Sequence, residues 1–137
     1  MTLNVEDKKA LSEIRIGKSR VFLDDAKQNF GEGRFYTSVN RSYYASLSAV
    51  RSLLILEGID SDSHSGAVTM LSLHFVRTKL LPVEVVRDFK TLLSRCTDVD
   101  YGDFETVEKD DAEDSYDKAE SILAQIDTVR TRLILEM

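Results

Sequence analysis

The amino-acid sequence predicts an all-α protein, an up-down four-helix bundle with one additional helix. Only one proline and six glycines interrupt the 137 residues, so long helices are favoured over many short strands. Apolar residues recur at the three- and four-residue spacing of helices, and no run shows sustained strand alternation. A chain of this length is typical of one domain, and we expect a single helical domain over residues 1–137.

The first predicted helix runs from about Val5 to Asn29. Asn4 is its expected N-cap, with Asp7 three residues further on, and glycines after the last turn provide a stop. Its expected apolar stripe consists of Leu11, Ile14, Val21, Phe22 and Ala26.

The second predicted helix, from about Arg34 to Glu57, has the clearest pattern. Five apolar residues fall within a narrow arc at 100° per residue and are expected to face the core. They are Val39, Tyr43, Leu47, Val50 and Leu54. A second arc forms a polar and partly basic strip of Asn40, Arg41, Tyr44, Ser48 and Arg51. This helix is therefore the expected central element of the bundle.

Three further helices complete the prediction. The third runs from about Gly66 to Thr78, and the fourth from Pro82 to about Tyr101. The fifth follows a cap at Thr106 and continues to about Leu135, with an apolar side of Ala112, Tyr116, Ala119, Leu123 and Ile126. Short connections between long amphipathic helices place neighbours antiparallel, which gives the up-down order.

The net charge of −6 is unevenly distributed. Residues 98–120 hold eleven Asp or Glu against two lysines, which we interpret as a solvated helix face rather than a dedicated partner site. No stretch approaches the roughly 20 apolar residues of a membrane span, and the charged beginning of the chain lacks the apolar segment of a signal peptide. We therefore expect a cytoplasmic protein without membrane association. The single cysteine excludes an internal disulfide framework and a cysteine-rich zinc site.

The end of the fourth predicted helix carries two charged residues next to an apolar stripe. Phe89, Leu93 and Cys96 form this stripe, Asp100 falls on it one turn later, and Arg95 lies at its edge. A carboxylate directed at an apolar seam is costly unless it meets a cation, a donor or water. This placement predicts either a polar pocket or an ion pair that fixes the helix end, and periodicity alone favours the ion pair.

Three segments of the chain together resemble the HEPN domain family. They contain Arg41-Ser42-Tyr43-Tyr44-Ala45, then Ser63-His64-Ser65-Gly66, then Arg95 through Asp100-Tyr101. The resemblance runs from about Ala10 to Ile126 and implies a HEPN-like four-helix core with an additional helix, paired as a homodimer. Many members are toxins of toxin–antitoxin pairs that cut RNA without a metal, and members are often encoded beside a minimal nucleotidyltransferase.

The resemblance also implies functional residues. The nuclease motif is an Arg, four to six residues and a His. Arg95 matches the Arg, and Asp100 stands where the pattern has His. Histidine can act as both base and acid near neutral pH, whereas an aspartate could serve as a base but would seldom be protonated. The predicted catalytic residues are Arg95 and Asp100, and the predicted nucleotide- or RNA-binding residues are Arg41, Tyr44, His64, Arg95 and Tyr101.

Several of these residues have an ordinary structural alternative. His64 could hold a structural hydrogen bond, Tyr44 could make a helix or dimer contact, and Tyr101 could pack at the helix end or be modified by the partner enzyme. The leading hypothesis is a nucleotide- or RNA-binding component of a two-component module with a nucleotidyltransferase. The alternatives are a metal-independent ribonuclease toxin using Asp100 and a non-catalytic helical dimer or adaptor. No metal or cofactor is predicted.

Overall fold

The computed structural model describes residues 2–101 and 107–137, and the side chains of residues 2–98 and 107–137. Its helices are α1 (Val5–Gly31), α2 (Phe35–Leu54), α3 (His64–Leu71), α4 (Val83–Tyr101) and α5 (Lys109–Leu135). A 3₁₀ turn, η1 (Ile55–Glu57), continues α2, and a π-helix, η2 (Ser72–Val76), continues α3. The described residues contain no strand, so the predicted all-α class is confirmed.

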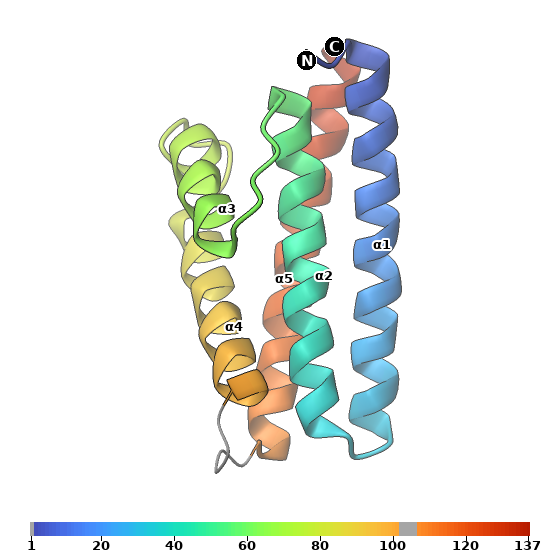
Figure 1. Cartoon of the computed structure of the whole chain (residues 1–137), viewed down its shortest axis with the longest axis vertical. Coiled ribbons are helices and arrows are strands. Elements are labelled where there is room, and N and C mark those ends of the chain that lie inside the picture. Colours follow the sequence, from blue (N-terminus) through green and yellow to red (C-terminus); the bar gives the residue numbers. More distant parts are fainter. Residues whose placement is uncertain (1, 102–106) are drawn as a thin grey trace.

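The four long helices run up and down beside one another, and α3 with η2 is the additional element (Figure 1). Helices α2 and α5 pack against each other in the middle of the bundle, and α1 and α4 lie on opposite sides of this pair. Within the described ranges α1 and α4 do not touch. Figure 1 also places the N- and C-terminal ends of the chain at the same end of the bundle.

The core forms around α2, as the sequence predicts. The five residues of its expected inner face are at most 3% exposed: Val39, Tyr43, Leu47, Val50 and Leu54. Fully buried side chains from the other helices, including Phe75, Phe89, Ile122 and Ile126, complete this core. Every residue from 37 to 56 is buried or half-buried, so neighbouring helices cover α2 on most of its circumference.

The apolar stripe predicted for α1 is confirmed at Ala26, which is fully buried, and is wrong at Ile14 and Val21. Ile14 is 55% exposed and Val21 is 69% exposed, whereas two serines of this helix, Ser12 and Ser19, are fully buried. The Asn4 cap is confirmed, because the Asn4 side chain accepts a hydrogen bond from the Asp7 amide at 2.8 Å. The expected stripe fails because α1 meets α2 through small and polar residues, which a hydropathy pattern assigns to the surface.

A seven-residue repeat of small residues joins α1 to α2. Antiparallel positions pair as Ser12 with Ser52, Ser19 with Ala45 and Ala26 with Ser38, and all six residues are fully buried. In each pair a serine hydroxyl donates to the backbone carbonyl of the residue opposite, at 2.7 Å. Small side chains let two helix backbones approach closely, and each hydroxyl finds its acceptor on the facing helix. We call these three pairs the serine rungs.

A buried arginine joins α1 to α5. Arg130 is 5% exposed, and its guanidinium donates to Glu13 at 2.9 Å and to Asp127 at 3.2 Å. Asp127 also accepts from Arg20 on α1 at 3.0 Å. A buried guanidinium needs such partners because desolvating an unpaired charge is costly. The network therefore holds the two terminal helices together.

The third and fifth helices depart from their predicted boundaries. Helix α3 begins at His64 rather than Gly66, because the Ser63 hydroxyl caps it by accepting from the Gly66 amide at 2.9 Å. The π-helix η2 was not predicted. Helix α5 begins at Lys109, and the predicted cap Thr106 lies outside the described residues.

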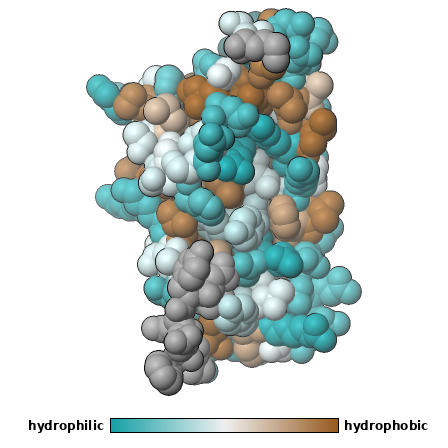
Figure 2. Space-filling model, viewed as in Figure 1, coloured by the Kyte–Doolittle hydropathy of each residue, from teal (hydrophilic) through white to brown (hydrophobic). Residues whose placement is uncertain are grey.

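The described part of the chain contains no helix that is both long and apolar enough to cross a membrane. On the face seen in Figure 2, hydrophilic and hydrophobic residues are interspersed. The largest brown group in that view lies near the end of the bundle that holds both termini. Val5, Leu135 and Met137 are exposed hydrophobic residues of these terminal segments.

Candidate functional site

The predicted site residues come from three helices of the bundle. Arg41 and Tyr44 are one turn apart on α2, His64 is the first residue of α3, and Arg95 is on the second half of α4. The backbone of Asp100 and Tyr101 belongs to α4, but their side chains lie outside the described residues. The pairing of Arg95 with Asp100, and any role of Tyr101, therefore stay predictions.

Arg41 is half-buried between α1 and α2. Its Nε donates to Asp25 of α1 at 3.0 Å, and its Nη1 donates to the Asn40 side chain at 2.6 Å. The Asn40 amide in turn donates to the Sγ of Cys96 on α4 at 3.7 Å. Arg41 is 37% exposed, so its guanidinium is positioned by the protein and still reaches solvent. Cys96 is buried, as predicted.

An aromatic cluster follows Arg41 along α2. The Tyr43 ring stacks nearly parallel on His64 and on Phe89, with centroid separations of 5.4 and 5.8 Å. The ring of Tyr44 meets Tyr43 edge-on at 5.2 Å and lies 6.0 Å from Phe22 of α1. Tyr43 is fully buried, as predicted, whereas Tyr44 keeps a half-buried position on the strip.

Tyr43 orients the His64 ring. The phenol forms a hydrogen bond with Nδ1 of His64, which confirms that its hydroxyl has a partner. Burial raises the pKa of Tyr43, and the nearby Cys96 and Tyr44 add to the shift, so the phenol keeps its proton. The phenol is then the donor and Nδ1 the acceptor, which leaves the proton of a neutral imidazole on Nε2. His64 is exposed and thus offers an N–H donor to an incoming group.

Two arginines contact the segment between η1 and α3, which leads to His64. Arg51 donates to the carbonyl of Ser61 at 3.2 Å, and Arg15 of α1 pairs with Asp60 at 3.2 Å. In the described part of the chain, Nε of Arg51 and Nη1 of Arg15 are buried without a hydrogen-bond partner. Buried donors without a partner are unfavourable, and these two lie on the arginines that contact this segment.

Arg95 faces α5. Its Nη1 donates to Asp114 at 2.7 Å and to the Ser115 hydroxyl at 3.0 Å, and Lys118 donates to the same carboxylate at 2.8 Å. The hydrogen bond from Lys118, followed by that from Arg95, lowers the pKa of Asp114 although burial opposes the shift. Arg95 therefore takes part in an ion pair between α4 and α5, and its side chain remains 30% exposed.

The sequence predicted the polar strip of α2, but it did not identify the acidic side chains that hold the predicted arginines. Asp25 and Asp114 hold the two predicted arginines, and neither stands out in the sequence, because each is one acid among many on a solvated helix. The structure joins Tyr44 to His64 through Tyr43. Arg41 lies one turn before Tyr44 on α2 and is held by Asn40 and Asp25. Arg95 is next to Cys96, which joins this network, but its own guanidinium points to α5.

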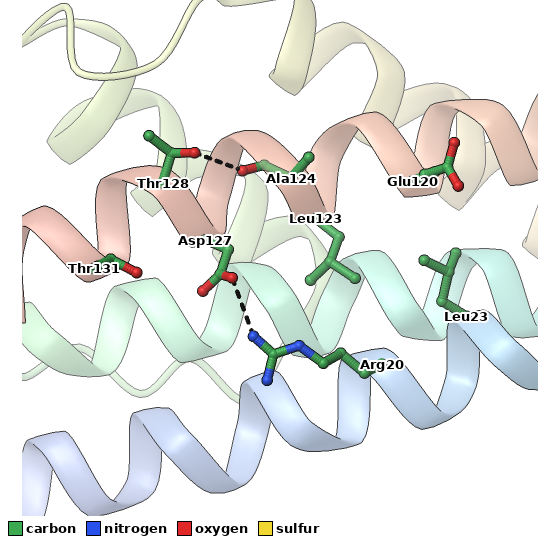
Figure 3. Close-up of a pocket in the computed structure, with 8 residues that line it drawn as sticks. All are labelled: Arg20, Leu23, Glu120, Leu123, Ala124, Asp127, Thr128 and Thr131. Atoms are coloured by element: carbon green, nitrogen blue, oxygen red, sulfur yellow. Dashed lines mark hydrogen bonds and ion pairs between the residues drawn. The ribbon is translucent and has the colours of Figure 1, made fainter.

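A groove of about 550 Å³ lies elsewhere, between α1 and α5 (Figure 3). It is lined by Arg20, Leu23, Glu120, Leu123, Ala124, Asp127, Thr128 and Thr131. The pair of Arg20 and Asp127 spans it in Figure 3. No predicted site residue lines this groove. The described residues also contain no group of three acids, histidines or cysteines arranged to hold a metal ion.

Comparison with known proteins identifies the family. The family model described as the HEPN domain matches residues 12–129. The chain belongs to the HEPN family. This assignment confirms the resemblance carried by the Tyr43, His64 and Arg95 segments and agrees with the all-α fold.

Three relatives are similar to this chain over most of its length. A UPF0332 protein of Thermotoga maritima is 29% identical over 123 residues, which cover 90% of this chain and 93% of the relative. A UPF0332 protein of Archaeoglobus fulgidus is 31% identical over 102 residues, which cover 72% and 78% of the two chains. A Methanocaldococcus jannaschii protein named "Putative toxin MJ0142" is 29% identical over 90 residues, which cover 65% and 61%.

Proposed function

We propose that this protein is the HEPN component of a toxin–antitoxin-type pair and that it binds RNA or nucleotide on the outer strip of α2. The observation that carries the proposal is that Arg41 and Tyr44 lie one turn apart on α2 and that Tyr43 contacts both Tyr44 and His64. The relative named as a toxin supports the module, and the partner that the family resemblance implies is a minimal nucleotidyltransferase.

The chemistry of this group suits a phosphate and a base. A guanidinium pairs with phosphate oxygens, and the half-exposed Tyr44 ring offers a face on which a base can stack. The outward N–H of His64 is a third donor for a phosphate or a base edge. Because Asp25 and Tyr43 already orient Arg41 and His64, these two side chains lose little conformational freedom when a ligand binds.

Binding of a labelled single-stranded RNA of about 12 nucleotides, followed by fluorescence anisotropy, tests the proposal. We expect affinity to fall steeply between about 50 and 200 mM salt, as phosphate contacts require. Arg41→Gln and Tyr44→Leu should each weaken binding several-fold. Arg34→Gln, which removes an exposed arginine just before α2, is the matched control and should bind as the wild type does. Absence of binding at low salt would refute the proposal.

Ribonuclease activity is a second candidate, favoured by the relative named as a toxin. In this hypothesis Asp100 would act as the base that activates the 2′-hydroxyl, and Arg95 would stabilise the phosphate. Purified protein should then degrade RNA in the presence of EDTA, and Arg95→Ala and Asp100→Asn should each abolish the degradation. If RNA stays intact with fresh wild-type protein, the ribonuclease hypothesis is contradicted and RNA or nucleotide binding remains the proposed function.

The partner and the dimer have their own tests. Co-expression with a nucleotidyltransferase encoded by the adjacent reading frame should yield a complex that survives purification. Sedimentation of the protein alone should give twice the mass of one chain. Monomeric protein that fails to retain the adjacent gene product would favour a simpler binding module over a two-component system.

A further inference from the structure

A second groove lies between the additional helix and α4, away from the strip on α2. It has a volume of about 470 Å³ and is lined by Ser65, Val68, Thr69, Ser72, Leu73, Arg77, Lys90 and Leu93. None of these eight residues belongs to the predicted site. The groove therefore needs an explanation of its own.

The groove is aliphatic at its base and lacks aromatic side chains. Val68, Leu73 and Leu93 are its aliphatic lining residues, and Leu73 is 43% exposed. A base stacks on an aromatic or guanidinium plane, and among the lining residues Arg77 alone has one. Aliphatic side chains of a protein segment fit such a surface better than nucleotide bases do.

The rim of the groove is positively charged. Arg77 and Lys90 are both exposed, and no acid lines the groove with them. Among the residues that the structure describes, neither of the two forms an ion pair. Residues 64–97 carry five Lys or Arg against two Asp or Glu, although the whole chain has a net charge of −6. The groove is thus a basic region of an acidic protein.

The π-helix places Arg77 on this groove. At about 100° per residue, an uninterrupted α-helix would carry Arg77 about 120° around the axis from Ser65 and would bring Val76 to the groove instead. A π-turn accommodates one additional residue, so the chain after Ser72 is shifted by one position. Arg77 then replaces Val76 beside Ser65, Ser72 and the groove. π-turns often occur at functional sites, because their irregular geometry is otherwise unfavourable.

We propose that this groove is the docking site for an acidic amphipathic helix of a partner protein. Leucine-type side chains at helical spacing would occupy the surface of Val68, Leu73 and Leu93. Carboxylates on the flanks of the same helix would pair with Arg77 and Lys90. The inference goes beyond RNA binding, because it concerns a different face and a protein ligand.

A designed probe tests the proposal. The probe is a labelled helical peptide of about 18 residues, made of leucine and glutamate with leucines at i, i+3, i+4 and i+7. Anisotropy should show binding to the wild type that weakens with salt. Arg77→Glu with Lys90→Glu should lower affinity by roughly tenfold or more, and Leu73→Ser should lower it several-fold. Lys18→Glu with Arg34→Glu, which reverses two exposed charges elsewhere, is the matched control and should leave affinity unchanged.

A peptide and a protein variant with exchanged charges complete the test. A leucine–lysine peptide of the same pattern should bind the Arg77→Glu, Lys90→Glu variant better than the wild type. The proposal is overturned if the acidic peptide fails to bind the wild type or binds the charge-reversed variant equally well. It is also overturned if that variant abolishes RNA binding or self-association, because the occupant would then be RNA or a second copy. Circular dichroism confirms that each variant folds, and the Arg41→Gln variant should still bind the acidic peptide.

Discussion

The serine rungs between α1 and α2 give a stability prediction that can be worked out in detail. Ser19 is fully buried, and its hydroxyl donates to the carbonyl of Ala45 at 2.7 Å. Ser19→Ala removes this hydrogen bond without adding bulk, which should lower the free energy of unfolding by about 1 kcal/mol. Ser19→Leu also forces a branched side chain between two closely packed backbones, so its total cost should be about 2–4 kcal/mol.

A second substitution extends this prediction. The rung between Ser38 and Ala26 lies one seven-residue step away, at about 10 Å along the helix axis. Effects at that separation add to within about 0.5 kcal/mol, so Ser19→Ala with Ser38→Ala should cost about 2 kcal/mol.

Urea unfolding followed by circular dichroism measures these differences as shifts in midpoint at constant slope. The matched control is Gln28→Leu, which introduces the same side chain at an exposed position of α1. The explanation by close helix packing is refuted if Ser19→Leu and Gln28→Leu unfold at the same urea concentration.

Three further predictions concern the ion pairs and the buried tyrosine. Arg130→Met should lower the free energy of unfolding, measured with urea, by about 1–3 kcal/mol, because it removes a buried guanidinium whose partner acids remain partly hydrated. Glu13→Gln should lower it by less than about 1 kcal/mol, because Glu13 is exposed. The pKa of Asp114 is lowered in the folded state, so this carboxylate stabilises the fold above the unfolded-state pKa of about 4, and the stabilisation is lost as the pH falls further. Asp114→Asn should remove this part of the acid-dependent loss, measured by urea unfolding between about pH 2 and pH 6. The pKa of Tyr43 is raised, so its contribution is complete below about pH 10 and is lost at higher pH. Tyr43→Phe should reduce the alkaline loss of stability in urea titrations, whereas Tyr44→Phe should leave the contribution of Tyr43 in place.

The sequence predicted the buried face of α2, where large apolar residues make the contacts between helices. Val39, Tyr43 and Leu47 repeat at helical spacing, so the inner face of α2 could be predicted without a structure. Helix α1 shows the opposite case. Ser19 and its partner Ala45 are small enough to lie between helix backbones. Serine has the hydropathy of a surface residue, so the burial of Ser19 could not be inferred.

The candidate site was predictable to a similar extent. The phenol of Tyr43 needed a partner because it lay on the apolar stripe, but its pairing with His64 joins positions 21 residues apart and depends on how α3 packs. The partner of Arg95 is 19 residues away on α5, in a segment where acids are abundant. Periodicity places a residue on a face of its own helix and carries no information about which residue of another helix it meets.

The π-helix has a genetic consequence, because it differs from an ordinary helix by a single residue. Loss of one codon within Ser72–Val76 would restore regular winding, and the arginine of position 77 would then lie eleven residues after Ser65. At about 100° per residue it would stay within about 20° of Ser65 around the helix axis, beside the groove. The buried residues that come before it, Val68 and Leu71, would keep their positions in the core. Loss of a single residue from this turn would therefore keep the basic character of the surface and the rest of the bundle, whereas the same loss within a regular helix would turn every later residue away from its neighbours.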